Sequence, residues 1–158
     1  MNLALALVTL VVSTGTLPKA GTLEPGRSLG GVRLGETAAQ TRAALGSSYG
    51  VCTGCSRTTW YFTYGKFTRS GLAVELERDR VSAVYTIWSP PGWHAPKGLA
   101  LGAPRGQIEP LAGALLPVAC PGYDALVRDA GGTRTVYYVV DGKLWGFGLM
   151  AARANPCR

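Results

Sequence analysis

One short pattern occurs twice in this chain, and it limits the possible folds more than any other feature. The residues Leu-Gly, Gln and Gly within positions 34–46 return within positions 101–113, at a constant offset of 67 residues. A Cys-x-Gly at 52–54 likewise returns at 120–122. A repeat of this length is typical of a supersecondary unit used twice, and neither copy is large enough to bury much core by itself. The pattern therefore predicts two units that pack together.

Each copy predicts a helix followed by antiparallel strands. Thr37 and Gln40 have the spacing of a capping box, and Gly46 suits the position just after a helix. Pro104 suits the first turn of a second helix. Alternating, β-branched and aromatic runs predict strands at 59–64, 72–77, 81–88, 124–128, 135–140 and 144–150.

Two dipeptides predict the turns between these strands. Asp141-Gly142 is a strong hairpin signal, and Arg78-Asp79 is predicted to turn the chain after strand 72–77. That strand alternates in character, so we expect Ala73, Glu75 and Glu77 to face water while the residues between them face the core.

The expected fold class is therefore α+β, with two tandem helix–antiparallel-strand repeats whose sheets lie side by side and whose helices cover one face. The expected organisation is a signal peptide at 1–20, a linker at 21–29, a first repeat at 30–88, a Pro-rich connector at 89–97 and a second repeat with a C-terminal tail at 98–158.

The first residues predict export from the cytoplasm. Residues 1–12 form an apolar run that is too short to span a bilayer comfortably, and small residues follow it. This is typical of a secretory signal peptide, although Lys and Arg are missing from its start. Cleavage after Gly15 or after Ala20 is expected, and a buried N-terminal strand or helix is the alternative. We expect a secreted or cell-envelope protein with no stable membrane span once the signal is removed.

Four cysteines behind a signal peptide predict two disulfides. Of the three pairings, we expect Cys52–Cys55 to close a tight loop and Cys120–Cys157 to tie the tail to the second repeat. A C-x-x-C can also exchange disulfides, but that chemistry favours a helix N-terminus, and residues 56–60 predict a strand. A zinc site would need a second C-x-x-C. We predict no metal and no cofactor, and a redox protein is the alternative.

The charge and the polar residues argue against two further classes of function. The net charge is +7, yet the basic residues are scattered without a cluster or a recognised motif, so nucleic acid is not the predicted partner. The single histidine, His94, lies in the connector, and the chain has no G-x-S-x-G, phosphate loop or close carboxylate pair. The sequence therefore predicts a protein that is not an enzyme.

The aromatic residues are the best candidates for binding a partner. Large rings occupy both faces of strand 59–64, and Trp and Tyr carry much of the binding energy at protein interfaces. The alternative is that the rings fill gaps in the core. We predict partner-binding roles for Tyr61, Trp88, Trp93, Tyr137 and Trp145, with Arg78 and Arg80 tuning orientation.

A Leu-Gly-x-x-x-x-Gln helix start, the Cys loop after it, and a hairpin ending in a basic residue before Val or Leu together form a known pattern. Over residues 30–150 the chain resembles the tandem-repeat β-lactamase inhibitor protein (BLIP) family and, more distantly, the BamE/SmpA envelope lipoproteins. The resemblance implies a helix–strand unit used twice, secretion, stabilising disulfides and a concave sheet face that binds a protein. The cysteine spacing departs from the family's wider, within-repeat disulfides.

The predicted function is that of a secreted, non-catalytic protein-binding module, inhibitor-like in character, whose partner is an extracellular or envelope protein. The alternatives are a thiol–disulfide protein that uses Cys52 and Cys55, and a structural component of the cell envelope.

Overall fold

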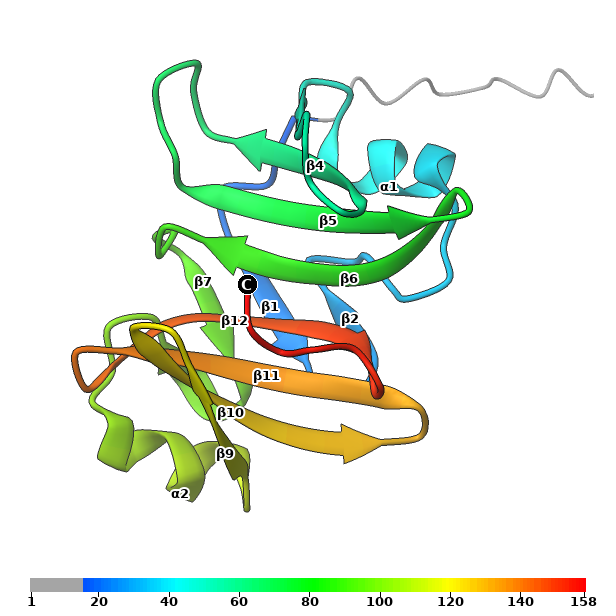
Figure 1. Ribbon diagram of the computed structural model, residues 1–158. Helices are drawn as coiled ribbons and strands as arrows, with labels where there is room; N and C mark the ends of the chain where they lie inside the picture. Colours follow the sequence, from blue (N-terminus) through cyan, green and yellow to red (C-terminus); the bar gives the residue numbers. More distant parts are fainter. Residues whose placement is uncertain (1–15) are drawn as a thin grey trace, which may run out of the picture.

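Strands dominate the structure, a computed structural model that describes residues 16–158 (Figure 1). Of these described residues, 47% are in strands and only 13% are in helices, and the strands form two sheets. The predicted α+β class with helices covering one face is therefore wrong. Most of the predicted signal peptide, residues 1–15, lies outside the described residues.

The larger sheet has eight antiparallel strands in the order β3-β4-β5-β6-β12-β11-β10-β9. Their bounds are β3 (Gly50–Val51), β4 (Thr58–Thr63), β5 (Gly71–Glu77), β6 (Arg80–Ile87), β9 (Leu116–Cys120), β10 (Tyr123–Ala130), β11 (Thr133–Val140) and β12 (Lys143–Ala151). All six predicted strands are confirmed. Both predicted turns are also confirmed, because Arg78, Asp79, Asp141 and Gly142 all have the positive φ of a primed hairpin turn.

A short junction between β6 and β12 joins the two halves of this sheet. Only three residue pairs form its ladder, from Tyr85 opposite Gly148 to Ala83 opposite Met150. A Cβ added to Gly148 would lie 2.4 Å from the Tyr85 Cβ and 2.5 Å from the Val84 carbonyl oxygen. Glycine is therefore what allows the two strands to approach each other here. Beyond the ladder, the Phe147 amide donates to the Thr86 hydroxyl.

The smaller sheet is built mainly from the segments predicted as the linker and the connector. Its strands are β1 (Gly21–Glu24), β2 (Ser28–Leu29), β7 (Trp93–Ala95) and β8 (Leu99–Ala100), in the order β2-β1-β7-β8. The linker at 21–29 and the connector at 89–97 thus pair with each other through β1 and β7. Strands of two to four residues are too short to show an alternating pattern, which explains the error.

Two short helices flank the smaller sheet on one face of the larger one (Figure 1). Helix α1 (Ala38–Leu45) begins with the predicted capping box. The backbone N–H of Gln40 donates to the Thr37 hydroxyl, and the backbone N–H of Thr37 donates to the side-chain oxygen of Gln40. Helix α2 (Ile108–Ala112) has only five residues. Neither helix can cover a sheet of eight strands, so the smaller sheet packs between them and completes the core. No helix among the described residues is long and apolar enough to cross a membrane.

Residues 16–20, which fall within the predicted signal peptide, contact the rest of the protein. Leu17 packs against the core, and the Pro18 carbonyl accepts a hydrogen bond of 2.7 Å from the Tyr64 hydroxyl. Cleavage after Ala20 would remove both contacts, whereas cleavage after Gly15 would keep them.

The opposite face of the large sheet carries the C-terminal tail, residues 152–158. The tail lies over a second apolar cluster that includes Ala73, Tyr85 and Tyr138. As a result Ala73 and Glu75 are buried, and the expectation that they face water is wrong. Only Glu77 of the expected polar face is exposed. Alternation along β5 predicted two faces correctly but could not show that the tail covers one of them.

Candidate binding site

A cleft of about 870 Å³ opens beside the tail on this second face, close to where the β6–β12 ladder ends. We call it the aromatic cleft, because six aromatic side chains line it. These are Tyr61, Tyr85, Trp88, Tyr123, Tyr138 and Trp145. Lys66, Arg69 and Arg158 also line it, and none of the described residues in its lining is Asp or Glu. The cleft is therefore apolar within and positively charged.

Small residues lie beside the large aromatic ones on this face of the sheet. Across the first half of the sheet, Ala73 lies between Tyr61 and Tyr85 in register. Across the second half, Tyr138 lies opposite Gly146 on one side and Ala125 on the other. Directly opposite residues share a face of the sheet, so on this face the large rings alternate with residues that have small side chains or none.

Two backbone irregularities place the tryptophans at the cleft. Trp145 is the unpaired residue of a β-bulge, because Gly146 pairs with Tyr138 while Leu144 pairs with Val139. A bulge re-aims a side chain that regular alternation would place elsewhere. Trp88, just after β6, has a φ of 53°, which costs a non-glycine residue roughly 1–2 kcal/mol.

The irregular backbone brings the two indoles together. The Trp88 and Trp145 rings meet edge to face with their centroids 5.8 Å apart. Trp88 remains 53% exposed, and Trp145 is half-buried. A large indole that is this exposed is suited to contact another molecule.

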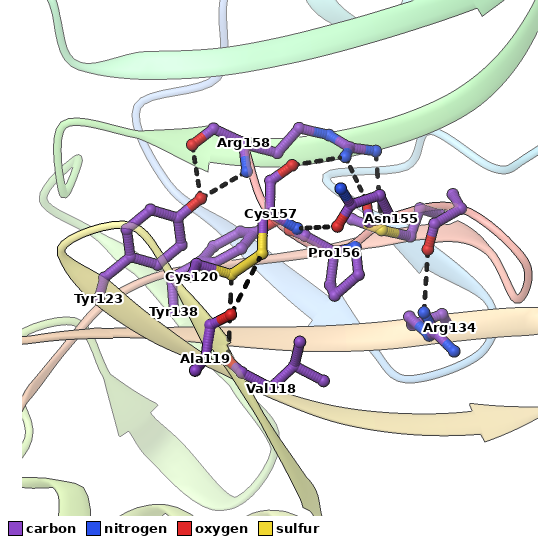
Figure 2. Close-up of a disulfide and its surroundings, with 12 residues drawn as sticks. Val118, Ala119, Cys120, Tyr123, Arg134, Tyr138, Asn155, Pro156, Cys157 and Arg158 are labelled. Atoms are coloured by element: carbon purple, nitrogen blue, oxygen red, sulfur yellow. Dashed lines mark hydrogen bonds between the residues drawn. A yellow bond between two sulfur atoms is a disulfide. The ribbon is translucent and has the colours of Figure 1, made fainter.

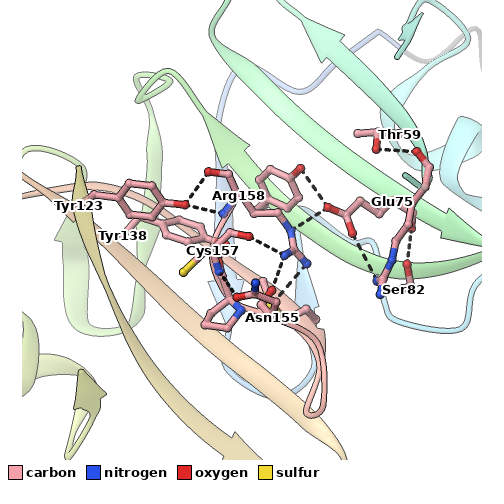
Figure 3. Close-up of polar contacts among 12 residues, drawn as sticks. Thr59, Glu75, Ser82, Tyr123, Tyr138, Asn155, Cys157 and Arg158 are labelled. Atoms are coloured by element: carbon pink, nitrogen blue, oxygen red, sulfur yellow. Dashed lines mark hydrogen bonds and ion pairs between the residues drawn. The ribbon is translucent and has the colours of Figure 1, made fainter. Parts of the chain in front are cut away.

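The cations around the cleft differ in what they contact. The Arg69 guanidinium lies over the Trp88 ring, 5.2 Å from its centroid. Lys66 lies in the same loop, residues 64–70, between β4 and β5. Within residues 16–158 neither of them forms an ion pair. Arg158, in contrast, pairs with the buried Glu75 through an Nε–Oε1 contact of 2.7 Å (Figure 3).

The buried tyrosine hydroxyls are used within the protein. The Tyr85 hydroxyl donates to Glu75 at 3.2 Å, and the Tyr138 hydroxyl donates to the Pro156 carbonyl at 3.0 Å. Burial raises the pKa of both phenols well above the ordinary value, and the Glu75 carboxylate raises the pKa of Tyr85 further. Both groups stay protonated at neutral pH, so they offer ring surface and not a catalytic base.

The tail forms one wall of the cleft and connects the two halves of the large sheet. Cys157 is bonded to Cys120 at the end of β9, with a Cα–Cα distance of 5.5 Å (Figure 2). The Tyr123 hydroxyl donates to the Arg158 carbonyl at 2.5 Å. The Arg158 side chain then reaches Glu75 on β5. The predicted Cys120–Cys157 pairing is confirmed.

The second predicted disulfide, Cys52–Cys55, is confirmed as well. It closes the loop between β3 and β4, and Cys55 is exposed. No helix begins at this loop, so the pair does not have the helix dipole that lowers the pKa of an attacking thiol.

Three of the five predicted aromatic residues meet at the aromatic cleft, namely Tyr61, Trp88 and Trp145. The other two are wrong as partner-binding residues. Trp93 is 2% exposed and packs against Gly21 and Gly30, while Tyr137 is 1% exposed and lies in the main core.

The predicted orienting residues Arg78 and Arg80 do not reach the cleft. They lie in the β5–β6 turn and at the start of β6, at the opposite end of β5 from Arg69. Arg80 donates to the Gly35 carbonyl instead.

Sequence reasoning missed Lys66, Arg69, Tyr85, Tyr123, Tyr138 and Arg158. Alternation places neighbours such as Tyr137 and Tyr138 on opposite faces, but it does not show which face holds the main core. The tail has no periodic pattern, so nothing in the sequence placed Arg158. Among the described residues, no group of three or more His, Cys, Asp and Glu side chains is arranged to hold a metal ion.

No protein-family model and no curated protein matches this chain. Two solved structures are similar to it. One is a DUF4309 family protein (YjgB) from Bacillus subtilis, with 17% identity over 73% of this chain and 78% of that chain, and a TM-score of 0.53. The other is an extracellular protein containing a SCP domain from Bacillus anthracis, with 9% identity and a TM-score of 0.54 over 75% of this chain and 44% of that chain. At these identities the similarity shows the fold alone.

Proposed function

We propose that the chain is a non-catalytic protein-binding module that works outside the cytoplasm and takes a segment of its partner protein into the aromatic cleft. The observation that carries this proposal is the convergence of six aromatic side chains on one open cleft, with Trp88 left half exposed beside it. Tryptophan and tyrosine are the residue types most enriched among binding hot spots.

The polar groups of the cleft support binding more than catalysis. The buried hydroxyls of Tyr85 and Tyr138 are engaged by Glu75 and by the tail. Arg158 is likewise engaged by Glu75. A bound partner can therefore contact aromatic surface and the charges of Lys66 and Arg69, which form no ion pair within residues 16–158.

Location outside the cytoplasm is supported by the chemistry of the cysteines. Both disulfides are formed, and such bonds persist in oxidising compartments. The apolar run at residues 1–12 is consistent with export.

A site-specific photo-crosslinker tests the proposal in the secreting cell. Trp88 and Trp145 are replaced in turn by benzoylphenylalanine, and Leu116, which is 72% exposed on the outer strand β9, serves as the matched control. We expect one partner protein to crosslink from both cleft positions and not from position 116. Crosslinking that is absent at the cleft, or equal at all three positions, would contradict the proposal.

The purified partner then allows a quantitative test. A Trp88→Ala, Trp145→Ala double variant should bind it about 30-fold more weakly, which corresponds to a hot-spot loss of about 2 kcal/mol. Leu116→Ala should bind as the unsubstituted protein does. An activity assay on a partner that is an enzyme would separate an inhibitor from a passive binding module, and a partner fixed in the envelope would favour a structural role.

One observation favours thiol–disulfide exchange as a second candidate, namely the exposure of Cys55. Its test is the reduction potential of the Cys52–Cys55 pair. A value below about −300 mV is typical of a structural bond, whereas a value of about −200 mV or above would favour the redox function.

A further inference from the structure

We infer that the segment bound by the aromatic cleft is acidic, with an Asp or Glu carboxylate close to an aromatic or large aliphatic side chain. This inference rests on the proposed function and adds the chemistry of the partner. It follows from the charges of the cleft, from the position of Arg69 and from the shape of the lining.

The charge of the cleft is unbalanced at one side. Lys66 and Arg69 lie in the loop between β4 and β5 and have no ion-pair partner within residues 16–158. The third cation, Arg158, already has Glu75. Because none of the described lining residues is Asp or Glu, Lys66 and Arg69 can pair with an anionic group of a bound ligand. Complementary charge across an interface fixes partner choice and speeds association.

The position of Arg69 links the charge to the apolar surface. Its guanidinium lies over Trp88, and such stacking orients the group at little loss of hydration. The fork of a stacked guanidinium can still bind a carboxylate through two parallel hydrogen bonds. The Trp88 and Trp145 rings are in contact immediately beside it. A carboxylate on Arg69 and an apolar side chain on the indoles would therefore come from neighbouring positions of one segment.

The lining favours a polypeptide over an anionic polymer without apolar groups. The cleft presents six rings, and among the described residues two of its cations have no ion-pair partner. Its volume of about 870 Å³ lies near the upper end of the ~300–1,000 Å³ of ligand pockets, which suits several side chains. Strong binding of a polyanion requires many phosphate contacts along a basic track.

A random peptide library displayed on phage tests the inference on the full, oxidised chain. Selected peptides are synthesised and titrated against the unsubstituted protein, Trp88→Ala, Arg69→Glu and Arg78→Glu. The last variant is the matched control, because Arg78 is also exposed and the change in net charge is the same, but it lies at the other end of β5. All three positions are exposed, and thermal unfolding confirms that each variant is folded.

We expect the selected peptides to combine an acidic residue with an aromatic or large aliphatic neighbour. Their affinity should fall about tenfold or more in Trp88→Ala and in Arg69→Glu, and less than about twofold in Arg78→Glu. Poly-L-glutamate, which is acidic without apolar groups, should bind at least about tenfold more weakly than these peptides.

Each other outcome overturns a distinct part of the account. Peptides that depend on Trp88 but are not acidic, and that bind Arg69→Glu unchanged, would overturn this inference and leave the proposed function standing. Equal losses in Arg69→Glu and Arg78→Glu would show attraction by net charge alone and would also overturn it, as would tight binding of polyglutamate. Selected peptides that bind Trp88→Ala as well as the unsubstituted protein would overturn the proposed function itself.

Discussion

Removing the Cys120–Cys157 bond is expected to reduce stability about twice as much as removing Cys52–Cys55. The two bonds differ in the length of chain that each closes, with sequence separations of 37 and 3 residues. The entropy that a crosslink removes from the unfolded chain grows with the logarithm of this length. The relation gives about 4 kcal/mol for the longer loop and about 2 kcal/mol for the shorter one.

The structure adds a second reason for the difference. Without its bond to β9, the tail is held mainly by the Arg158–Glu75 pair and by a few hydrogen bonds, including the one from Tyr138 to Pro156. Release of the tail exposes the apolar cluster around Tyr85 and Tyr138. It leaves the Glu75 carboxylate with the Tyr85 hydroxyl and with the partly exposed Arg57, 3.6 Å away, as its remaining cation among residues 16–158. Loss of one partner of a buried ion pair is strongly destabilising.

Urea unfolding of two double serine variants, one for each disulfide, measures both values. The free energies of unfolding should fall by about 4 kcal/mol and about 2 kcal/mol, respectively. Equal losses, or a larger loss for the Cys52–Cys55 variant, would refute the view that the tail is a tethered part of the fold.

Three further predictions follow from burial and close packing. Because the pKa values of Tyr85 and Tyr138 are raised in the folded state, the free energy of unfolding should be unaffected below pH 10 and should fall above it, by roughly 1.4 kcal/mol per pH unit for each tyrosine. Urea unfolding between pH 9 and 11 should show that this free energy falls less steeply with pH in Tyr138→Phe. An unchanged steepness would contradict the raised pKa of Tyr138. Trp93→Ala should lower the free energy of unfolding by about 3–5 kcal/mol, whereas Trp88→Ala should change it by less than about 0.5 kcal/mol. Similar losses in the two variants would contradict the finding that Trp93 is buried and Trp88 is exposed. Gly148→Ala should destabilise the protein by about 1–3 kcal/mol through the clash with Tyr85 and Val84, and a neutral result in thermal unfolding would show that the β6–β12 junction is wider than described.

The long hairpins could be predicted because their signals are local. Alternation marked β5, β-branched and aromatic residues marked β11, and Arg78-Asp79 and Asp141-Gly142 marked the turns that follow them. The capping box of α1 and both disulfide pairings were also predicted correctly. The turns, the capping box and the Cys52–Cys55 loop involve residues that are close in sequence, and four cysteines allow only three pairings to choose from.

The second sheet and the covering tail could not be predicted, since both depend on contacts between distant segments. Gly21 pairs with Trp93, and Arg158 reaches Glu75. Because the sequence does not show these contacts, segments 21–29 and 89–97 resemble linkers, and the predicted fold class is wrong. The same limit applies to the site, where sequence composition identified Tyr61, Trp88 and Trp145 as candidates but could not exclude the buried Trp93 and Tyr137.

The most direct test of the aromatic cleft is a fluorine NMR titration of the protein labelled with 5-fluorotryptophan. The chain has four tryptophans, and each gives a separate signal. Trp88 and Trp145 line the cleft, while Trp60 and Trp93 are buried on the other face of the large sheet. On addition of a selected peptide or the crosslinked partner, the account predicts that the signals of Trp88 and Trp145 shift and those of Trp60 and Trp93 do not. Unmoved signals from Trp88 and Trp145 in the presence of a bound partner would contradict it.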